Sequence, residues 1–380
     1  MKKMSVFLLA FLIFATTFVN AQNKPKKKMN SDFHLLVGTY TSGKSEGIYV
    51  YKFNALTGDF TAESIAKNVK NPSFLAVSPN EKFVYSAGEI DKNGAVYAFS
   101  FDKKLGNLTQ LSTQSSNGNY PCHVAIDKTG KWVIAGNYGA GSLTVLPVEA
   151  NGGLGKPTQT IQHEGKGKNA ERQESPHVHS INIAPNNIDV FVADLGIDKL
   201  VTYSLDAKTG ILSKGNPAFT KLEDGTGPRH FTMHPNGKFA YVIQELSSQI
   251  TAFDYKKGSL TAIESISTLP ADYKGANSCA DIHISPDGKF LYGSNRIHDS
   301  IVIYSIDQKT GKLTYIINES TKGKKPRNFI IDPTGNYVLV ANQETDNIVI
   351  FKRDAQKGTL TPTGQEISVP NPVCLKMIGF

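Results

Sequence analysis

Short apolar stretches separated by turn residues recur along most of the chain. Each copy of the pattern starts at a small or polar residue and has two apolar stretches joined by Pro or another turn residue. Three clear copies span Pro228–Glu245, Cys279–Arg296 and Pro326–Gln343. Weaker copies begin at Pro72, Pro121 and Pro176, and a truncated copy begins at Pro372. The starts lie roughly 46 to 55 residues apart, a period typical of propellers and solenoids.

The apolar stretches inside each copy are short and alternating, which favours strands. Val338–Ala341 and Ile348–Phe351, for example, flank a polar turn, and Gly residues such as Gly311 mark hairpins between copies. Four short strands per copy, repeated seven times, predict an all-β, seven-bladed β-propeller. A linear solenoid is the alternative.

The two ends of the chain predict how the ring closes. The copy at Pro372 is long enough for one strand only, while Phe33–Tyr40 and Gly47–Phe53 precede the first full copy. We expect the C-terminal strand to pair with these N-terminal strands and complete the seventh blade, because this pairing removes two open sheet edges. A solenoid leaves all three segments unpaired.

The first residues predict export. Lys2 and Lys3 precede an apolar run, Val6–Val19, that suits a secretory signal better than a membrane span, and cleavage is expected after Ala21. We therefore divide the chain into a signal peptide (1–21), a basic polar tether (22–32) and a propeller domain (33–380). The mature protein is expected in the periplasm or outside the cell, with no membrane span after cleavage.

Charge and cysteine content narrow the function further. The formal net charge is +8, but six of these charges are lysines among the first 28 residues, so the body is close to neutral. A near-neutral body gives no reason to expect nucleic acid as a partner. Three cysteines in different repeats, Cys122, Cys279 and Cys374, do not form a disulfide framework and are expected as small buried residues on inner strands.

Two positions of the repeat vary in a way that a scaffold does not require. Six residues before the central turn of each copy stand Ser73, Cys122, His179, Arg229, Ala280 and Arg327. Nine or ten residues after it stand Gly88/Glu89, Asn137/Tyr138, Asp194/Leu195, Gln244/Glu245, Asn295/Arg296 and Asn342/Gln343. Equivalent positions form rings around a propeller axis, so both sets are expected near one mouth of the channel. Variation among such polar residues indicates a functional lining.

The polar residues of these rings suit lactone or acyl hydrolysis. A base must take a proton from water, and cations must face the oxyanion that develops. His179 and Glu245 are candidate bases, and Arg229, Arg296 and Arg327 are candidate oxyanion and anion partners. The alternative is that Arg229 and Arg327 pair with Glu245 and Glu344 to tie blades together.

The longest insertion, residues 162–179, carries Arg172, Gln173, His177 and His179. A His-x-His pair on one strand suits zinc, but no third ligand has a telling spacing, so we predict no metal and no cofactor. Nucleophile-elbow, phosphate-loop and dinucleotide-binding motifs are missing from the sequence.

These pieces together resemble the β-propeller lactonase family, typified by bacterial 6-phosphogluconolactonase and fungal carboxy-muconate cyclase. The matching segments are Arg172–His179, Gly227–His230 with Gln244–Glu245, Ser294–Arg296, and Pro326–Asn328 with Ala341–Gln343. The resemblance spans about residues 33–380 and implies a seven-bladed propeller. It also implies active-site roles for His179, Arg229, Glu245 and Arg296. Because the familiar lactonase is cytosolic, an export signal leaves the identity of the lactone open.

We therefore predict a metal-independent lactonase that acts on a small-molecule lactone. His179, Glu245, Arg229 and Arg296 are assigned to catalysis, and the substrate-binding set is Arg327, His177, Arg172, Gln173 and Asn342. The neighbouring arginines are expected to lower the pKa of His179, which makes it a neutral base near pH 7, while Glu245 stays ionised. The alternatives are a cycloisomerase that uses the same groups and a propeller that binds a ligand without turnover.

Overall fold

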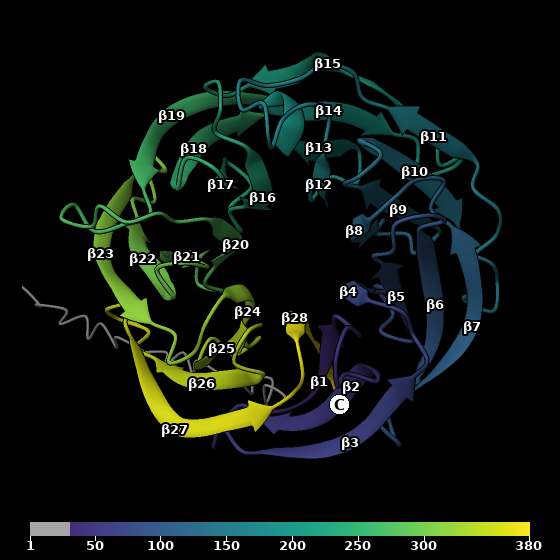
Figure 1. Ribbon diagram of the computed structural model, residues 1–380, viewed down its shortest axis with the longest axis horizontal. Helices are drawn as coiled ribbons and strands as arrows, with labels where there is room; N and C mark the ends of the chain where they lie inside the picture. Colours follow the sequence, from purple (N-terminus) through teal and green to yellow (C-terminus); the bar gives the residue numbers. More distant parts are fainter. Residues whose placement is uncertain (1–30) are drawn as a thin grey trace, which may run out of the picture.

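The computed structural model describes residues 31–380, which form seven four-stranded antiparallel sheets arranged in a ring around a common axis (Figure 1). The predicted signal peptide and nearly all of the predicted tether lie outside the described residues. Apart from one short 3₁₀ helix, η1 (Leu195–Ile197), the described part is built from strands and loops. No helix in this part is long and apolar enough to cross a bilayer.

Six blades are formed by consecutive segments, each written from the axis outward. The first three are β4 (Pro72–Val77), β5 (Phe83–Gly88), β6 (Ala95–Asp102) and β7 (Asn107–Ser115); β8 (Pro121–Ile126), β9 (Trp132–Asn137), β10 (Ser142–Pro147) and β11 (Gln159–Gln162); and β12 (Val178–Ile183), β13 (Asp189–Asp194), β14 (Lys199–Leu205) and β15 (Leu212–Lys221). The next three are β16 (Pro228–Met233), β17 (Phe239–Gln244), β18 (Gln249–Lys256) and β19 (Ser259–Ser267); β20 (Cys279–Ile284), β21 (Phe290–Asn295), β22 (Ser300–Ile306) and β23 (Leu313–Ser320); and β24 (Pro326–Ile331), β25 (Tyr337–Asn342), β26 (Asn347–Arg353) and β27 (Leu360–Ser368).

The seventh blade joins the two ends of the chain, as predicted. The C-terminal strand β28 (Pro372–Gly379) is innermost and pairs with β1 (Asp32–Thr39), which is followed by β2 (Gly47–Asn54) and β3 (Phe60–Lys67). The register pairs Leu36 with Lys376 and Val37 with Leu375. Both sheet edges that an open ring would leave free are thus hydrogen-bonded, and the seven-bladed propeller is confirmed.

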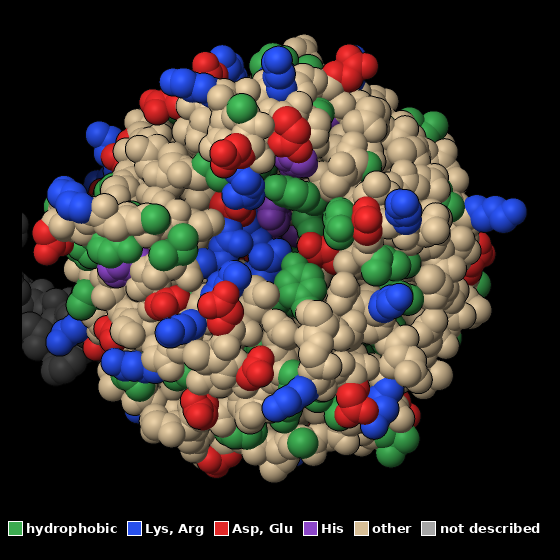
Figure 2. All heavy atoms as spheres, viewed as in Figure 1, with side chains coloured by type: hydrophobic (Ala, Val, Ile, Leu, Met, Phe, Trp, Pro, Cys, Tyr) green, Lys and Arg blue, Asp and Glu red, His purple; other side chains and the backbone are tan. Residues whose placement is uncertain are grey.

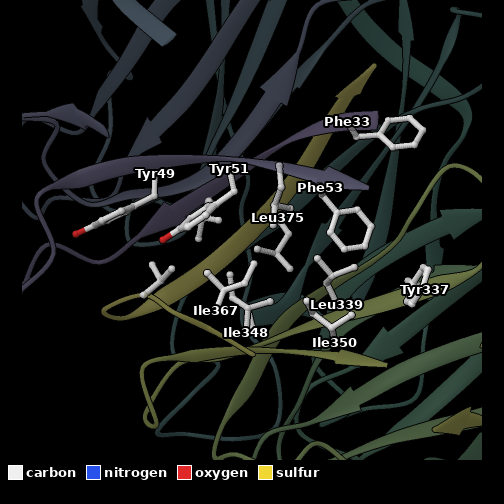
Figure 3. Packing of buried hydrophobic residues seen from close by; sticks show 14 of the residues in the cluster. Phe33, Tyr49, Tyr51, Phe53, Tyr337, Leu339, Ile348, Ile350, Ile367 and Leu375 are labelled. Carbon is white, nitrogen blue, oxygen red and sulfur yellow. The ribbon is translucent and has the colours of Figure 1, made fainter. Parts of the chain in front are cut away.

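Successive apolar residues of a strand point to its two opposite faces and build the cores between neighbouring blades. In β25, Leu339 and Ala341 pack toward the closing blade, while Val338 and Val340 pack toward the blade of β20–β23. Both faces of such a strand are buried, so its sequence reads as a continuous apolar run. Figure 3 shows the core against the closing blade, where Leu339 lies among aliphatic and aromatic side chains that include Phe53 and Leu375.

The three cysteines are free and buried on innermost strands, as expected. Cys122 lies on β8, Cys279 on β20 and Cys374 on β28. Cys122 is the one that borders the cavity described next.

Candidate active site

A β-bulge near the start of the innermost strands determines which side chains enter the channel. In β16, Pro228 pairs with Gln244 and His230 pairs with Ile243, which leaves Arg229 as the extra residue. His179 in β12 and Arg327 in β24 occupy the same place in their own blades. A bulge bends the strand and redirects the side chain of its extra residue. The side chains of the first ring predicted from the sequence therefore point toward the channel because each is the extra residue of a bulge.

The two rings meet at one mouth of the channel, where they line a small, open polar cavity of about 110 Å³. Its lining residues are Glu89, Cys122, Tyr138, Arg172, His179, Glu245, Arg296 and Arg327. Figure 2 shows Lys and Arg side chains gathered around the hollowed centre of one face, with acidic and His side chains among them. The lining carries a net positive charge, since three arginine side chains face two carboxylates.

Glu245 is the centre of this charge cluster. Its carboxylate accepts hydrogen bonds from Arg229 Nε at 2.9 Å and Arg172 Nη2 at 2.6 Å, and it forms an ion pair with Arg296 Nη2 at 2.8 Å. Burial alone raises the pKa of this carboxyl, but the charges of Arg296 and Arg229 outweigh it and hold the pKa at about 2. Glu245 is therefore ionised at neutral pH and a very weak base.

His179 faces Glu245 and is almost fully buried. Its Nε2 lies 3.9 Å from Glu245 Oε2, which is too long for a direct hydrogen bond. Burial, followed by the charge of Arg229, lowers the pKa of His179 well below its ordinary value of 6.5. The imidazole is neutral near pH 7 and one of its nitrogens is free to accept a proton.

Arg327 differs from the other arginines of the site. Arg172, Arg229 and Arg296 all bind Glu245, whereas Arg327 makes no hydrogen bond or ion pair with any group of residues 31–380. Its guanidinium lies 5.3 Å from the centre of the Tyr40 ring. The alternative in which Arg327 pairs with Glu344 is wrong, because Glu344 binds Lys325 Nζ at 2.8 Å. The fork of Arg327 is available to an anionic ligand.

Arg229 lies behind Glu245 and does not border the cavity. Its Nη1 donates to the carbonyl oxygen of Ala280 at 2.7 Å and to His230 Nε2 at 3.2 Å. His230 Nδ1 in turn lies 2.7 Å from Asp281 Oδ1. The guanidinium is thus fixed on the protein side, and burial together with the charge of Arg296 lowers its pKa to about 10.

Three residues assigned to substrate binding lie outside the cavity lining. Gln173 is fully buried and donates from Nε2 to the Leu195 carbonyl oxygen and to Asp198, which holds the 162–179 insertion in place. Asn342 is buried and donates to the Thr321 carbonyl oxygen. His177 packs flat on Tyr138 with ring centroids 4.4 Å apart. Arg172, from the same insertion, does line the cavity.

Tyr138 and Glu89 are lining residues to which the sequence reading assigned no role. Tyr138 OH accepts from Arg172 Nη2 at 3.3 Å, and its ring meets His179 edge-on at 5.4 Å. Glu89 accepts a hydrogen bond from Tyr40 OH at 2.8 Å. Both stand in the second ring of repeat positions, so their place in the repeat predicted that they lie near the channel mouth. Their residue types gave no reason to assign them a role in catalysis or binding.

The paired histidines of the insertion do not converge on one point. His177 Nδ1 lies 2.9 Å from the Tyr138 carbonyl oxygen, and its Nε2 lies 3.2 Å from Glu174. His179 Nδ1 faces Cys122 instead. Within residues 31–380, no group of three or more His, Cys, Asp or Glu side chains is arranged to hold a metal ion.

Residues 34–377 match the family model described as lactonase, 7-bladed β-propeller. The 6-phosphogluconolactonase of Bacillus subtilis (strain 168) is 39% identical over 345 residues, which are 90% of this chain and 97% of the relative. Among solved structures, a protein from Bacteroides fragilis NCTC 9343 has a TM-score of 0.88 and 40% identity, with 93% of this chain and 100% of that one covered. The periplasmic gluconolactonase of Pseudomonas aeruginosa has a TM-score of 0.88 and 33% identity, with 92% and 99% covered.

Proposed function

Since the chain belongs to the seven-bladed β-propeller lactonase family, we propose that it hydrolyses a sugar lactone to the open acid, as a 6-phosphogluconolactonase-type carboxylic-ester hydrolase. The observation that carries this proposal is the pairing of a neutral, buried imidazole with an ionised carboxylate inside an arginine-rich cavity. A protein that only binds a ligand does not need a neutral base, His179, held 3.9 Å from a carboxylate that three arginines already neutralise.

In this proposal His179 is the general base. A water molecule hydrogen-bonded to both His179 Nε2 and Glu245 Oε2 fits their separation of 3.9 Å, because each hydrogen bond is about 2.8 Å long. His179 takes the proton as the water oxygen attacks the lactone carbonyl carbon. Glu245 holds the water by accepting its other proton in a hydrogen bond. With a pKa of about 2 it is too weak a base to remove that proton.

The negative charge that develops on the carbonyl oxygen is stabilised by the arginines that border the cavity. The guanidinium of Arg327 has no hydrogen-bond or ion-pair partner among the described residues, so its full hydrogen-bonding capacity is available to the substrate. Arg296 also borders the cavity but shares its charge with Glu245 at 2.8 Å. We assign the main oxyanion contact to Arg327 and a supporting one to Arg296. Arg229 then acts as a positioning residue that holds Glu245.

After ring opening, the imidazolium of His179 returns its proton to the departing ring oxygen. The alkoxide leaves as a hydroxyl group, and the carboxylic acid product ionises. Every proton is thus accounted for by His179 and one water. His177, Gln173 and Asn342, which lie outside the cavity, serve this scheme by holding Tyr138, the insertion and the β25 end in place.

The proposal is tested by lactone-opening assays on purified protein, with acid release compared to the spontaneous rate. We expect the wild type to open phosphorylated or plain gluconolactone well above that rate and His179→Ala to lose roughly 10²-fold in kcat. Identical rates for wild type, His179→Ala and buffer would overturn it.

We further propose that the protein works outside the cytoplasm. This rests on the apolar run at Val6–Val19, and a relative of similar fold is a periplasmic gluconolactonase. Fractionation of cells that express the full chain, with N-terminal sequencing of the mature protein, tests export. A mature chain that starts at Met1 would contradict it.

A further inference from the structure

The cavity at the channel mouth is too small for a whole sugar lactone. Its volume is about 110 Å³, whereas ligand sites usually measure roughly 300–1,000 Å³. A sugar lactone bound with its carbonyl near His179 must therefore extend beyond the cavity. The direction in which it extends decides which other residues determine specificity.

Arg296 marks that direction, because it borders a second hollow as well. This groove of about 400 Å³ lies between the blade of β20–β23 and the blade of β24–β27. Besides Arg296 it is lined by Ser278, Ile297, Lys324 and Lys325 and by two carboxylates, Asp299 and Glu344. Arg296 Nη2 donates to Ser278 Oγ at 2.7 Å on this side and reaches Glu245 on the other. Arg296 thus lies between the groove and the cavity and borders both.

The groove carries an ammonium group without a counter-ion. Lys325 Nζ is bound by Glu344 at 2.8 Å, and Asp299 accepts the Lys325 backbone N–H at 2.7 Å. Lys324 Nζ has no ion pair among residues 31–380, although its backbone N–H is fixed by Thr345 Oγ1 at 3.1 Å. The backbone that presents Lys324 is therefore held on both sides, while its charge remains available.

Two neighbouring blades show that the turn before the innermost strand forms without a lysine pair. The two residues before the innermost strand are Thr226 and Gly227 ahead of β16, Asn277 and Ser278 ahead of β20, and Lys324 and Lys325 ahead of β24. Asp198 accepts the Gly227 N–H at 2.8 Å, just as Asp299 accepts the Lys325 N–H. The same backbone contact forms with or without lysine, so the turn itself does not require the lysine pair.

The geometry points to a phosphate subsite in this groove. Lys324 binds the distal phosphate of a phosphorylated sugar lactone there, while the lactone carbonyl lies in the small cavity beside His179 and Arg327. This inference rests on the proposed function and assigns its substrate class. A phosphate carries nearly two charges and several acceptor oxygens. It can therefore bind the Lys324 ammonium and the Ser278 hydroxyl together, with Arg296 adding charge from behind.

The test uses Lys324→Gln on the full chain, with Lys322→Gln as the matched control, because Lys322 is an exposed lysine of the same loop that does not border the groove. We expect Lys324→Gln to raise KM for 6-phosphogluconolactone roughly 3- to 10-fold and to change KM for unphosphorylated gluconolactone less than 2-fold. Lys322→Gln is expected to leave both values unchanged. Equal effects of Lys324→Gln on both lactones, or none on either, would overturn the subsite.

A binding measurement separates this inference from the proposed activity. Titration calorimetry with 6-phosphogluconate and gluconate, which differ only in the phosphate, is expected to show tighter binding of the former by wild type and a smaller difference for Lys324→Gln. The difference is expected to shrink at high salt. If wild type opens neither lactone but keeps this ratio, the activity is lost and the subsite stands. Equal or absent binding of both products by wild type would overturn the subsite.

Discussion

The Sγ atom of Cys122 lies 3.8 Å from Nδ1 of His179, on the side of the imidazole away from Glu245. Burial strongly raises the pKa of the Cys122 thiol, so it remains protonated at neutral pH. The thiol is within 3.6 Å of the carbonyl oxygens of Val178 and His179, to which it can donate. Sγ is then an acceptor for a proton on His179 Nδ1, which leaves Nε2 as the basic nitrogen facing the cavity.

We predict that Cys122 acts through the imidazole and not as a nucleophile. Cys122→Ser keeps a small group that can accept from Nδ1 and is expected to retain kcat within about 2-fold. Cys122→Ala removes the acceptor and should lower kcat roughly 3- to 10-fold, the equivalent of one weak hydrogen bond. A nucleophilic role predicts instead that both variants are inactive. Steady-state kinetics with a thermal-melting control for folding distinguishes the two.

The lowered pKa of His179 predicts an unusual pH profile. The active form is the neutral imidazole, so activity is lost as pH falls through its pKa in the folded protein, which lies well below 6.5. We expect kcat/KM, corrected for spontaneous opening, to stay flat from about pH 6 to 8 and to decline only at lower pH. A profile that falls by half near pH 6.5 would show that His179 has an ordinary pKa or is not the base.

The ionised state of Glu245 predicts a loss of stability in acid. Its pKa falls from an ordinary 4.5 to about 2 in the folded protein. The stabilisation is therefore present above pH 4.5 and is lost as pH falls toward 2, by about 3 kcal/mol in total. Glu245→Gln should abolish this part of the pH dependence of the unfolding free energy, while Glu344→Gln, an exposed control, should not. Equal pH dependence in wild type and Glu245→Gln would mean that the arginines do not lower the Glu245 pKa.

Two arginines of the first ring should give opposite phenotypes. Arg229 is buried and binds Glu245 and Ala280, so Arg229→Met should destabilise the protein by roughly 3–5 kcal/mol. Arg327 has no such bonds among the described residues, so Arg327→Met should leave the melting temperature nearly unchanged and lower kcat/KM by about 10²-fold. Denaturant unfolding and kinetics on both variants check this. A large stability loss for Arg327→Met with normal activity would reverse the assignment.

The repeat made the fold predictable, because a period near 50 residues with four short strands has few architectures open to it. The closing blade was predictable for the same reason: Pro372 starts a copy that is one strand long, and the N-terminal strands lacked an inner partner. Register also placed His179 and Glu245 at the same mouth of the channel. The fold, its closure and the placement of these two residues could all be predicted because equivalent positions of the repeat occupy equivalent places in each blade.

The partners of individual side chains were less predictable. Arg229 and Arg327 have the same repeat position and the same bulge, yet one lies behind Glu245 and the other borders the cavity. Arg229 meets the carboxylate of Glu245 in its own blade, whereas the equivalent residue in the blade of Arg327 is Gln343. The further ion pairs of Glu245 with Arg172 and Arg296 come from other parts of the ring, and the repeat gave no signal for them. Gln173 lies close to the site in sequence but turns inward to Asp198, because its amide satisfies buried groups that anchor the insertion.

Closure of the ring by β28 predicts that a buried side chain near the C-terminus is as important for stability as one in the middle of the chain. Leu375 is buried in the core between the closing blade and the blade of β24–β27 (Figure 3). Leu375→Ala should therefore lower the unfolding free energy by about 2–5 kcal/mol, since it leaves a cavity in a packed core. Leu56→Ala is the matched control, because Leu56 is 70% exposed and its truncation should cost little. Equal melting temperatures for the two variants would mean that β28 is dispensable and that the ring is held by the other six blades alone.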